Sequence, residues 1–131
     1  MTDPRTLLVV GTSGVGPKPS RCQIAAYRVP PTGAAVVVVG WKRLALSGAQ
    51  GRQPGRRPLE KLVAVQRPSF ECSAGRGAVA TLILGGKAYQ VNVLVGDRAS
   101  NQRVAEALAV ARSFDLARPQ RGFASGSGRA T

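Results

Sequence analysis

The sequence predicts an α+β domain, in which an antiparallel sheet of five to six strands carries one C-terminal helix packed on it. Three observations support this fold class. Residues 34–41 form a continuous apolar run, AAVVVVGW. Residues 77–84 and 87–95 have strand patterns separated by Gly85-Gly86, and residues 100–112 repeat apolar side chains at helical spacing.

The chain is long enough for one domain with its own core, since it has 131 residues of which 44% are hydrophobic. We expect residues 1–21 to form an N-terminal arm that holds at most one edge strand. Residues 22–118 should form the single α+β domain. Residues 119–131 are polar and glycine-rich, which predicts a disordered tail.

The first half of the domain should supply strands. Residues 22–29 are a candidate strand that ends at Pro30-Pro31. The β-branched run at residues 34–41 does not alternate with polar residues, which predicts a central strand covered on both faces.

A glycine- and proline-rich loop is predicted at residues 47–58, SGAQGRQPGRRP. Residues 59–67 and 69–73 should be two strand pieces bent at Pro68, because proline cannot donate a hydrogen bond to a ladder.

A two-residue glycine loop favours a primed hairpin turn between residues 77–84 and 87–95. The second strand alternates, which predicts one packed face and one wetter face. The packed face should hold Tyr89, Val91, Val93 and Val95, and the wetter face Gln90 and Asn92.

Asp97 and Ser100 are alternative caps for the helix at residues 100–112. Its apolar stripe should lie across the sheet, and residues 113–117 should return as a last short strand. The stripe consists of Val104, Ala107, Leu108 and Ala111.

The net charge is +13, and 15 of the 19 basic residues are arginine. Such charge favours an anionic partner if it clusters on one face, although a scattered arginine excess is also typical of base-biased genomes. Arginine forks suit phosphate, sulfate or carboxylate oxygens. The loop at residues 47–58 and its stem therefore either contact a polyanion or form an ordinary solvated surface loop. The candidate polyanion contacts are Lys42, Arg43, Arg52, Arg56 and Arg57.

The chain has no histidine and only six carboxylates, none of them close together in sequence. Histidine is the commonest general base and activates most serine and cysteine nucleophiles. The sequence therefore assigns no catalytic, cofactor-binding or metal-binding residue, and predicts a protein that is not an enzyme.

Cys22 and Cys72 are either one disulfide or two unpaired thiols; both neighbouring segments have strand patterns that could bring them together. A disulfide would indicate an oxidising compartment. The N-terminal MTDPRTLLVV lacks the apolar run of a secretory signal, and no segment approaches the roughly twenty apolar residues of a membrane span. The chain is either cytoplasmic or a domain whose export segment is missing.

The stretch GTSGVGPKPS, residues 11–20, nearly matches a phosphate-binding loop. That motif requires glycine, four residues, then Gly-Lys-Ser/Thr at the start of a helix. Here Pro17 follows Gly16, Lys18 is displaced by one position, and Pro19 disfavours helical angles at Lys18. We interpret the stretch as a linker that does not bind nucleotides.

Residues 69–116 resemble a module of uncharacterised secreted or membrane-anchored proteins of high-GC actinobacteria, and residues 22–41 resemble its partner half. The resemblance implies an extracytoplasmic β-rich domain with no assigned catalytic residue. It involves Phe70, Cys72, Gly75, Tyr89, Gly96, Ala99 and Ser113-Phe114.

Two hypotheses follow. The first is a non-enzymatic, extracytoplasmic or membrane-tethered domain of the cell envelope. The second is a cytoplasmic basic protein that associates non-specifically with nucleic acid. In either, polyanion binding should be weak and salt-sensitive, because no recognition helix or aromatic platform is evident.

Overall fold

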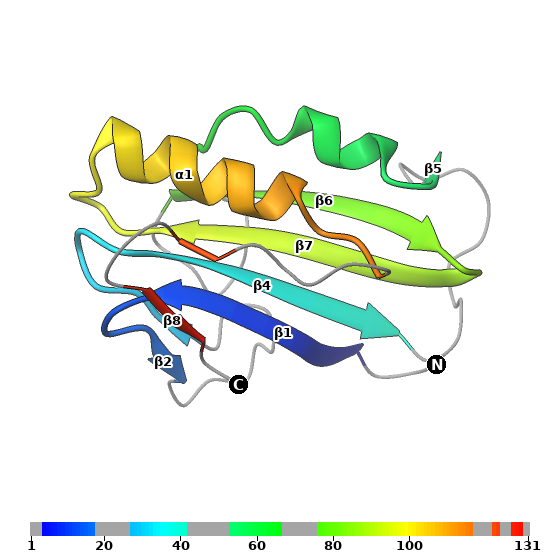
Figure 1. The fold of residues 1–131 in the computed structure, drawn as a ribbon, viewed down its shortest axis with the longest axis horizontal. Coiled ribbons are helices and arrows are strands. Elements are labelled where there is room, and N and C mark those ends of the chain that lie inside the picture. Colours follow the sequence, from blue (N-terminus) through cyan, green and yellow to red (C-terminus); the bar gives the residue numbers. More distant parts are fainter. Residues whose placement is uncertain are drawn as a thin grey trace.

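The computed structural model describes residues 4–17, 27–41, 53–66, 76–116, 122–123 and 127–129. Within them the fold is α+β, with a mainly antiparallel sheet and one α-helix, as the sequence predicts (Figure 1). The elements are β1 (Pro4–Thr12), β2 (Gly16–Pro17), β3 (Tyr27–Arg28), β4 (Ala34–Trp41), β5 (Gln53–Pro54), the 3₁₀-helix η1 (Arg57–Lys61), β6 (Arg76–Leu84), β7 (Lys87–Val95), α1 (Asn101–Arg112) and β8 (Ser127–Arg129).

Four long strands make up the body of the sheet, in the spatial order β6-β7-β4-β1. At one edge β5 adds two residues parallel to β6, and at the other β8 adds three residues antiparallel to β1. A separate ladder of two residue pairs joins β2 to β3. The sequence predicted five to six strands in one sheet. In the described residues four strands have eight or nine residues, and β5 and β8 add only two and three residues at the edges.

Strand β4 lies at the centre of the sheet, between β7 and β1. Its valines alternate between two apolar clusters on opposite faces: Val36 and Val38 face the α1 side, and Val37 and Val39 face the other. All four are fully buried. The prediction of a central strand covered on both faces is therefore confirmed.

The predicted hairpin is also confirmed. Strands β6 and β7 pair from Arg76↔Val95 to Leu84↔Lys87. Gly85 and Gly86 both have positive φ, 59° and 77°, as a type I′ turn requires at its two central positions.

The face of β7 opposite α1 is buried, which corrects the prediction of a wetter face. Asn92 is 0% exposed, and its Nδ2 donates to the carbonyl oxygen of Val37 at 3.2 Å. On the same face Val9, Val37, Val39 and Leu94 form the second apolar cluster. Alternation shows which side chains share a face but not whether that face is covered.

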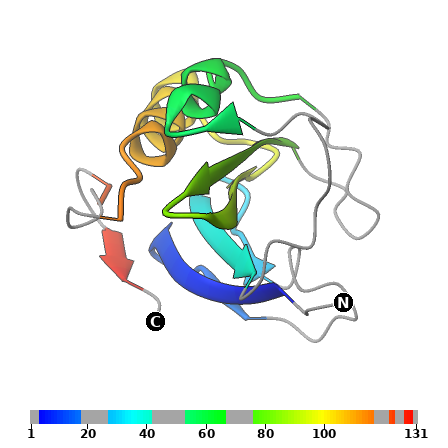
Figure 2. The ribbon, with the colours of Figure 1, turned by 90° about the vertical axis from the view of Figure 1, so that its right-hand side faces the viewer.

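Helix α1 packs on the sheet beside η1, and both lie over the same face (Figure 2). Ser100 is its N-cap: the Oγ accepts from the backbone N–H of Arg103 at 3.1 Å, which selects Ser100 over Asp97. Ala107, Leu108 and Ala111 of the predicted stripe are buried in the main core, together with Val110, and Val104 is partly buried against it.

Within residues 1–21, predicted as an arm with at most one edge strand, the described residues supply strand β1 to the main sheet. Strand β1 pairs with β4 from Pro4↔Trp41 to Gly11↔Ala35, with a bulge between Thr6 and Leu8. The apolar run that follows Thr6 is long enough to bury Val9 and Val10 on opposite faces of the sheet.

Two other predicted strands are absent from the described residues. A strand was predicted for residues 59–67, but residues 57–61 form the 3₁₀-helix η1. Of the described residues after η1, only Gln66 pairs with β6, in a single bridge to Gly77. Pro58 favours helical φ at this start, and Leu59 and Leu62, three residues apart, both reach the core. Residues 113–116 form no strand either, since Ser113 and Phe114 bond back to the end of α1.

Two short pieces of residues 119–131, the segment predicted as a disordered tail, contact the domain. Phe123 is 5% exposed and belongs to the main core. Residues 127–129 pair with Val10–Thr12. One large apolar side chain and the free edge of β1 order these short pieces despite their glycine-rich composition.

Candidate anion-binding site

Arg56, the residue before η1, reaches across to the C-terminal end of α1. Its Nε donates to the carbonyl oxygen of Phe114 at 2.7 Å, and its Nη2 donates to that of Arg112 at 2.8 Å. The last carbonyls of a helix have no partner within the helix, so Arg56 satisfies one of these at Arg112, and a second carbonyl just beyond α1 at Phe114. The Oδ2 of Asp115 lies 3.8 Å from Nε, an ion pair without a hydrogen bond.

Arg112, the last residue of α1, reaches in the opposite direction. Its Nη1 donates to the carbonyl oxygen of Leu62, the residue that follows η1. The two arginines therefore cross between η1 and α1, each bonded to main-chain carbonyls of the other element or its flank. We call Arg56, Arg112 and these carbonyls the arginine clasp.

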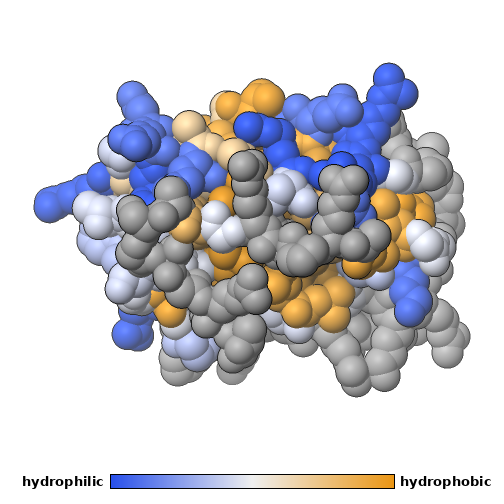
Figure 3. Space-filling model, viewed as in Figure 1, coloured by the Kyte–Doolittle hydropathy of each residue, from blue (hydrophilic) through white to orange (hydrophobic). Residues whose placement is uncertain are grey.

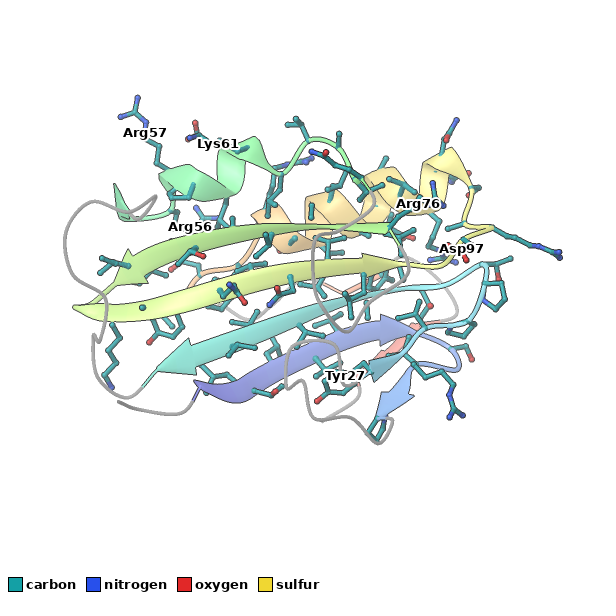
Figure 4. All side chains as sticks on the ribbon, turned by 180° about the vertical axis from the view of Figure 1, so that it is seen from behind. Tyr27, Arg56, Arg57, Lys61, Arg76 and Asp97 are labelled. Carbon is teal, nitrogen blue, oxygen red and sulfur yellow. The ribbon has the colours of Figure 1, made fainter. Side chains whose placement is uncertain are left out.

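A hollow of about 550 Å³ opens beside the clasp, lined by Arg56, Arg57, Leu59, Glu60 and Arg112. Leu59 is buried and Arg57 is exposed. Arg56 lies under η1, whereas Arg57 points away from the body of the molecule (Figure 4). Hydrophilic side chains also project from the surface at η1 in Figure 3.

The hollow carries a net positive charge. Both clasp guanidiniums are held by neutral carbonyls, so these bonds orient the cations without neutralising them. Within the described part of the chain, Arg57 has no ion-pair partner. Glu60 and Asp115 oppose three arginines, and the C-terminal helix dipole adds only about half a negative charge.

The structure brings two of the five predicted polyanion contacts, Arg56 and Arg57, to one hollow. It also gives Arg56 a second role, as a cap for α1. The remaining three, Lys42, Arg43 and Arg52, lie outside the described residues, as do both cysteines of the candidate disulfide, Cys22 and Cys72.

Arg112 is a residue of the hollow that the sequence did not predict; it lies outside the apolar stripe of the helix. Its place in the last turn of the predicted helix was a usable signal, since basic side chains there meet open carbonyls. Which segment those carbonyls would face could not be deduced from the local pattern.

The stretch that nearly matches a phosphate-binding loop leads into a strand in the described residues. Gly11 and Thr12 end β1, Gly14 turns the chain with φ of 90°, and Gly16–Pro17 pair with β3. A phosphate-binding loop requires a helix at this place. Lys18 and Pro19 lie outside the described residues.

Among the described residues, no three His, Cys, Asp or Glu side chains gather as a metal site would require. No helix there is long and apolar enough to cross a membrane. Comparisons with protein-family models, curated proteins and solved structures found nothing that matches the chain. The functional proposal therefore depends on the clasp and the hollow beside it.

Proposed function

We propose that this chain is a non-enzymatic binding domain of the cell envelope that holds an anionic polymer at the hollow beside the arginine clasp. The observation that carries the proposal is the pair of guanidiniums oriented by neutral carbonyls next to the exposed Arg57. Cations that are already fixed lose little side-chain freedom when an anion binds. The hollow therefore offers charge at a low entropic cost.

Binding should be weak, and it should not depend on the base sequence of a nucleic acid. The second arginine of α1, Arg103, donates to Glu106 at 2.6 Å, so the helix presents no row of free basic side chains to a groove. The described aromatic rings are buried or half-buried, which leaves no stacking platform among them. They are Tyr27, Tyr89, Phe114 and Phe123.

The cell-envelope location is supported by the resemblance of residues 69–116 to secreted or membrane-anchored proteins and by the candidate disulfide between Cys22 and Cys72. The alternative is a cytoplasmic protein that binds nucleic acid through the same charge. Because nothing in the described residues resembles a base-reading element, we favour an acidic envelope polymer as the ligand.

The proposal is tested by titrating labelled phosphorylated dextran, an anionic polymer with pendant phosphate groups, with the wild-type chain, Arg57→Gln and Arg98→Gln over a salt series. Arg98 is the matched control: it is exposed in the turn before α1, and the helix separates it from the hollow by about 18 Å. We expect wild-type affinity to fall steeply between about 50 and 200 mM salt. Arg57→Gln should weaken binding several-fold and reduce the salt slope by about one, as expected for the loss of one phosphate contact, and Arg98→Gln should have a smaller effect.

Equal losses for both variants would show that net charge binds the polymer without a site, and would overturn the proposal. Single-stranded DNA serves as the competitor. Tight binding of one DNA sequence at physiological salt would establish the nucleic-acid alternative instead.

A further inference from the structure

We infer, on the basis of the proposed function, that the chemical group selected by the hollow is a terminal phosphate with three free oxygens, rather than a carboxylate or an internal phosphodiester. The polymer would then be held through pendant or terminal phosphate monoesters. A sulfate ester has the same tetrahedral shape and three free oxygens, but only one charge.

The number and origin of the guanidiniums favour a group with three oxygens. A guanidinium is a planar fork, and one fork matches both oxygens of one carboxylate. Two guanidiniums from separate elements line the hollow, Arg56 before η1 and Arg112 at the end of α1. A tetrahedral group with three free oxygens offers an acceptor to each of them and to Arg57, whereas a carboxylate has only two oxygens.

The guanidiniums also keep N–H donors for a ligand. A guanidinium has five N–H groups. Arg56 uses two of them on carbonyls and Arg112 uses one, so both retain donors after the clasp has formed. Arg57, adjacent in the chain, adds an exposed side chain long enough to close over a bound group.

The net charge of the hollow favours a dianion. Three arginines outweigh Glu60 and Asp115, so a group with a charge near −2 is attracted about twice as strongly as a monoanion. A phosphate monoester reaches this charge above its second pKa, near 6. Acetate and dimethyl phosphate each carry a single negative charge and only two charged oxygens.

The test uses inorganic phosphate, methyl phosphate, dimethyl phosphate and acetate at matched ionic strength and pH 8. The readout is the set of arginine Nε–H signals in NMR spectra of the full chain. We expect phosphate and methyl phosphate to shift the signals of Arg56 and Arg57 saturably. Dimethyl phosphate and acetate should bind at least about five-fold more weakly, and Arg57→Gln should weaken the phosphate response several-fold.

Glu60→Gln provides a variant that should gain affinity, because it removes the carboxylate that lines the hollow. By Coulomb's law the gain in binding free energy should be about twice as large for a dianion as for a monoanion. Its fold-change for methyl phosphate should therefore be roughly the square of that for acetate.

Sulfate, which stays dianionic between pH 5 and 8, controls for pH. Phosphate binding should strengthen over this pH range, and sulfate binding should not.

The outcomes separate the two proposals. If acetate or dimethyl phosphate binds as well as methyl phosphate, the selectivity inferred here is wrong, while polymer binding that depends on Arg57 would still stand. If methyl phosphate binds but no anionic polymer competes with it, the proposed polymer function is wrong and a small-molecule phosphate site remains. If no probe shifts Arg56 or Arg57, the phosphate site is refuted.

Discussion

The guanidinium of Arg56 donates to the main-chain carbonyl of Arg112 at 2.8 Å, while the guanidinium of Arg112 donates to the carbonyl of Leu62. These bonds join residues 56 and 50 positions apart in the chain. The first bond joins the residue before η1 to the end of α1. The second joins the last residue of α1 to the residue after η1. The same two side chains line the hollow, so fold stability and anion binding share residues here.

Replacing Arg56 with Gln should destabilise the fold, whereas replacing Arg57 with Gln should not. The first change removes two bonds to carbonyls at the end of α1. Because Arg56 is partly exposed, water can replace some of these bonds, and we expect a loss of about 1 kcal/mol. Urea unfolding of both variants checks this, with hydrogen exchange at residues 109–113 showing whether the end of α1 frays. Equal stability of the two variants would mean that the clasp does not contribute.

Among the glycines that the structure describes, Gly96 is the least able to accept a side chain. A Cβ at this position would lie 2.1 Å from the carbonyl oxygen of Pro30 and 2.3 Å from that of Pro31. The backbone of this turn is also bonded on both sides, from Gly96 N to Gly33 O at 2.9 Å and from Arg98 N to Pro31 O at 2.7 Å.

We therefore expect Gly96→Ala to lower the free energy of unfolding by about 1–3 kcal/mol or more, because the clash is with main chain that cannot rotate away. Gly16→Ala is the matched control, since a Cβ there meets nothing within 4 Å. Thermal unfolding of the two variants measures the difference. A Gly96→Ala variant as stable as Gly16→Ala would contradict this packing of the turn.

The parts of the fold that the sequence predicted are those in which a local pattern determines the structure. The valine run predicted β4, the glycine pair predicted the β6–β7 turn, and Ser100 was one of two predicted caps. Each depends on residues close together in the chain, through burial, φ preference or a side chain that accepts from a nearby N–H.

The parts that it did not predict depend on partners far away in the chain. Whether Asn92 is buried depends on what covers its face, and the role of Arg112 depends on the carbonyl of Leu62, fifty residues earlier. The segment of strand β1 was predicted as an arm with at most one edge strand, because its place in the sheet depends on pairing with β4, which lies further along the chain. The loop arginines at 56 and 57 were predicted as a group by composition, but only the structure shows that one of them is a helix cap.

Phe123 should stabilise the fold although it lies in a polar, glycine-rich segment. It is buried in the main core, and Cζ of Arg103 lies 5.9 Å from the centre of its ring. Truncating a buried phenylalanine to alanine typically costs about 3–5 kcal/mol, and we expect about 2 kcal/mol or more at this position close to the chain end. Leu116→Ala is the control, because Leu116 is 53% exposed. If Phe123→Ala unfolds at the same urea concentration as Leu116→Ala, residues 122–123 do not pack as described.

The last prediction concerns Cys22 and Cys72, which decide between the two locations. Both lie in strand-like segments of the sequence, CQIAAY and FECS, and we predict that their Cα atoms lie within about 7 Å, the distance that a disulfide requires. A bridge would form in an oxidising compartment and not in a reducing cytosol. Free thiols are blocked at lysis in protein purified from its native host, and we expect the protein to carry no blocking group. After reduction and a second treatment with the reagent it should carry two.

The control for this measurement is Cys72→Ser expressed in the same host, in which Cys22 should be blocked at lysis without reduction. Loss of the bridge should also lower stability, because the loop that it closes has about fifty residues and such loops are worth roughly 4 kcal/mol in the chain-entropy model. Complete blocking of both thiols in the unreduced wild-type protein would contradict the disulfide and, with it, the main chemical argument for the cell envelope. The arginine hollow would then be better explained by the nucleic-acid alternative, because its charge does not depend on compartment.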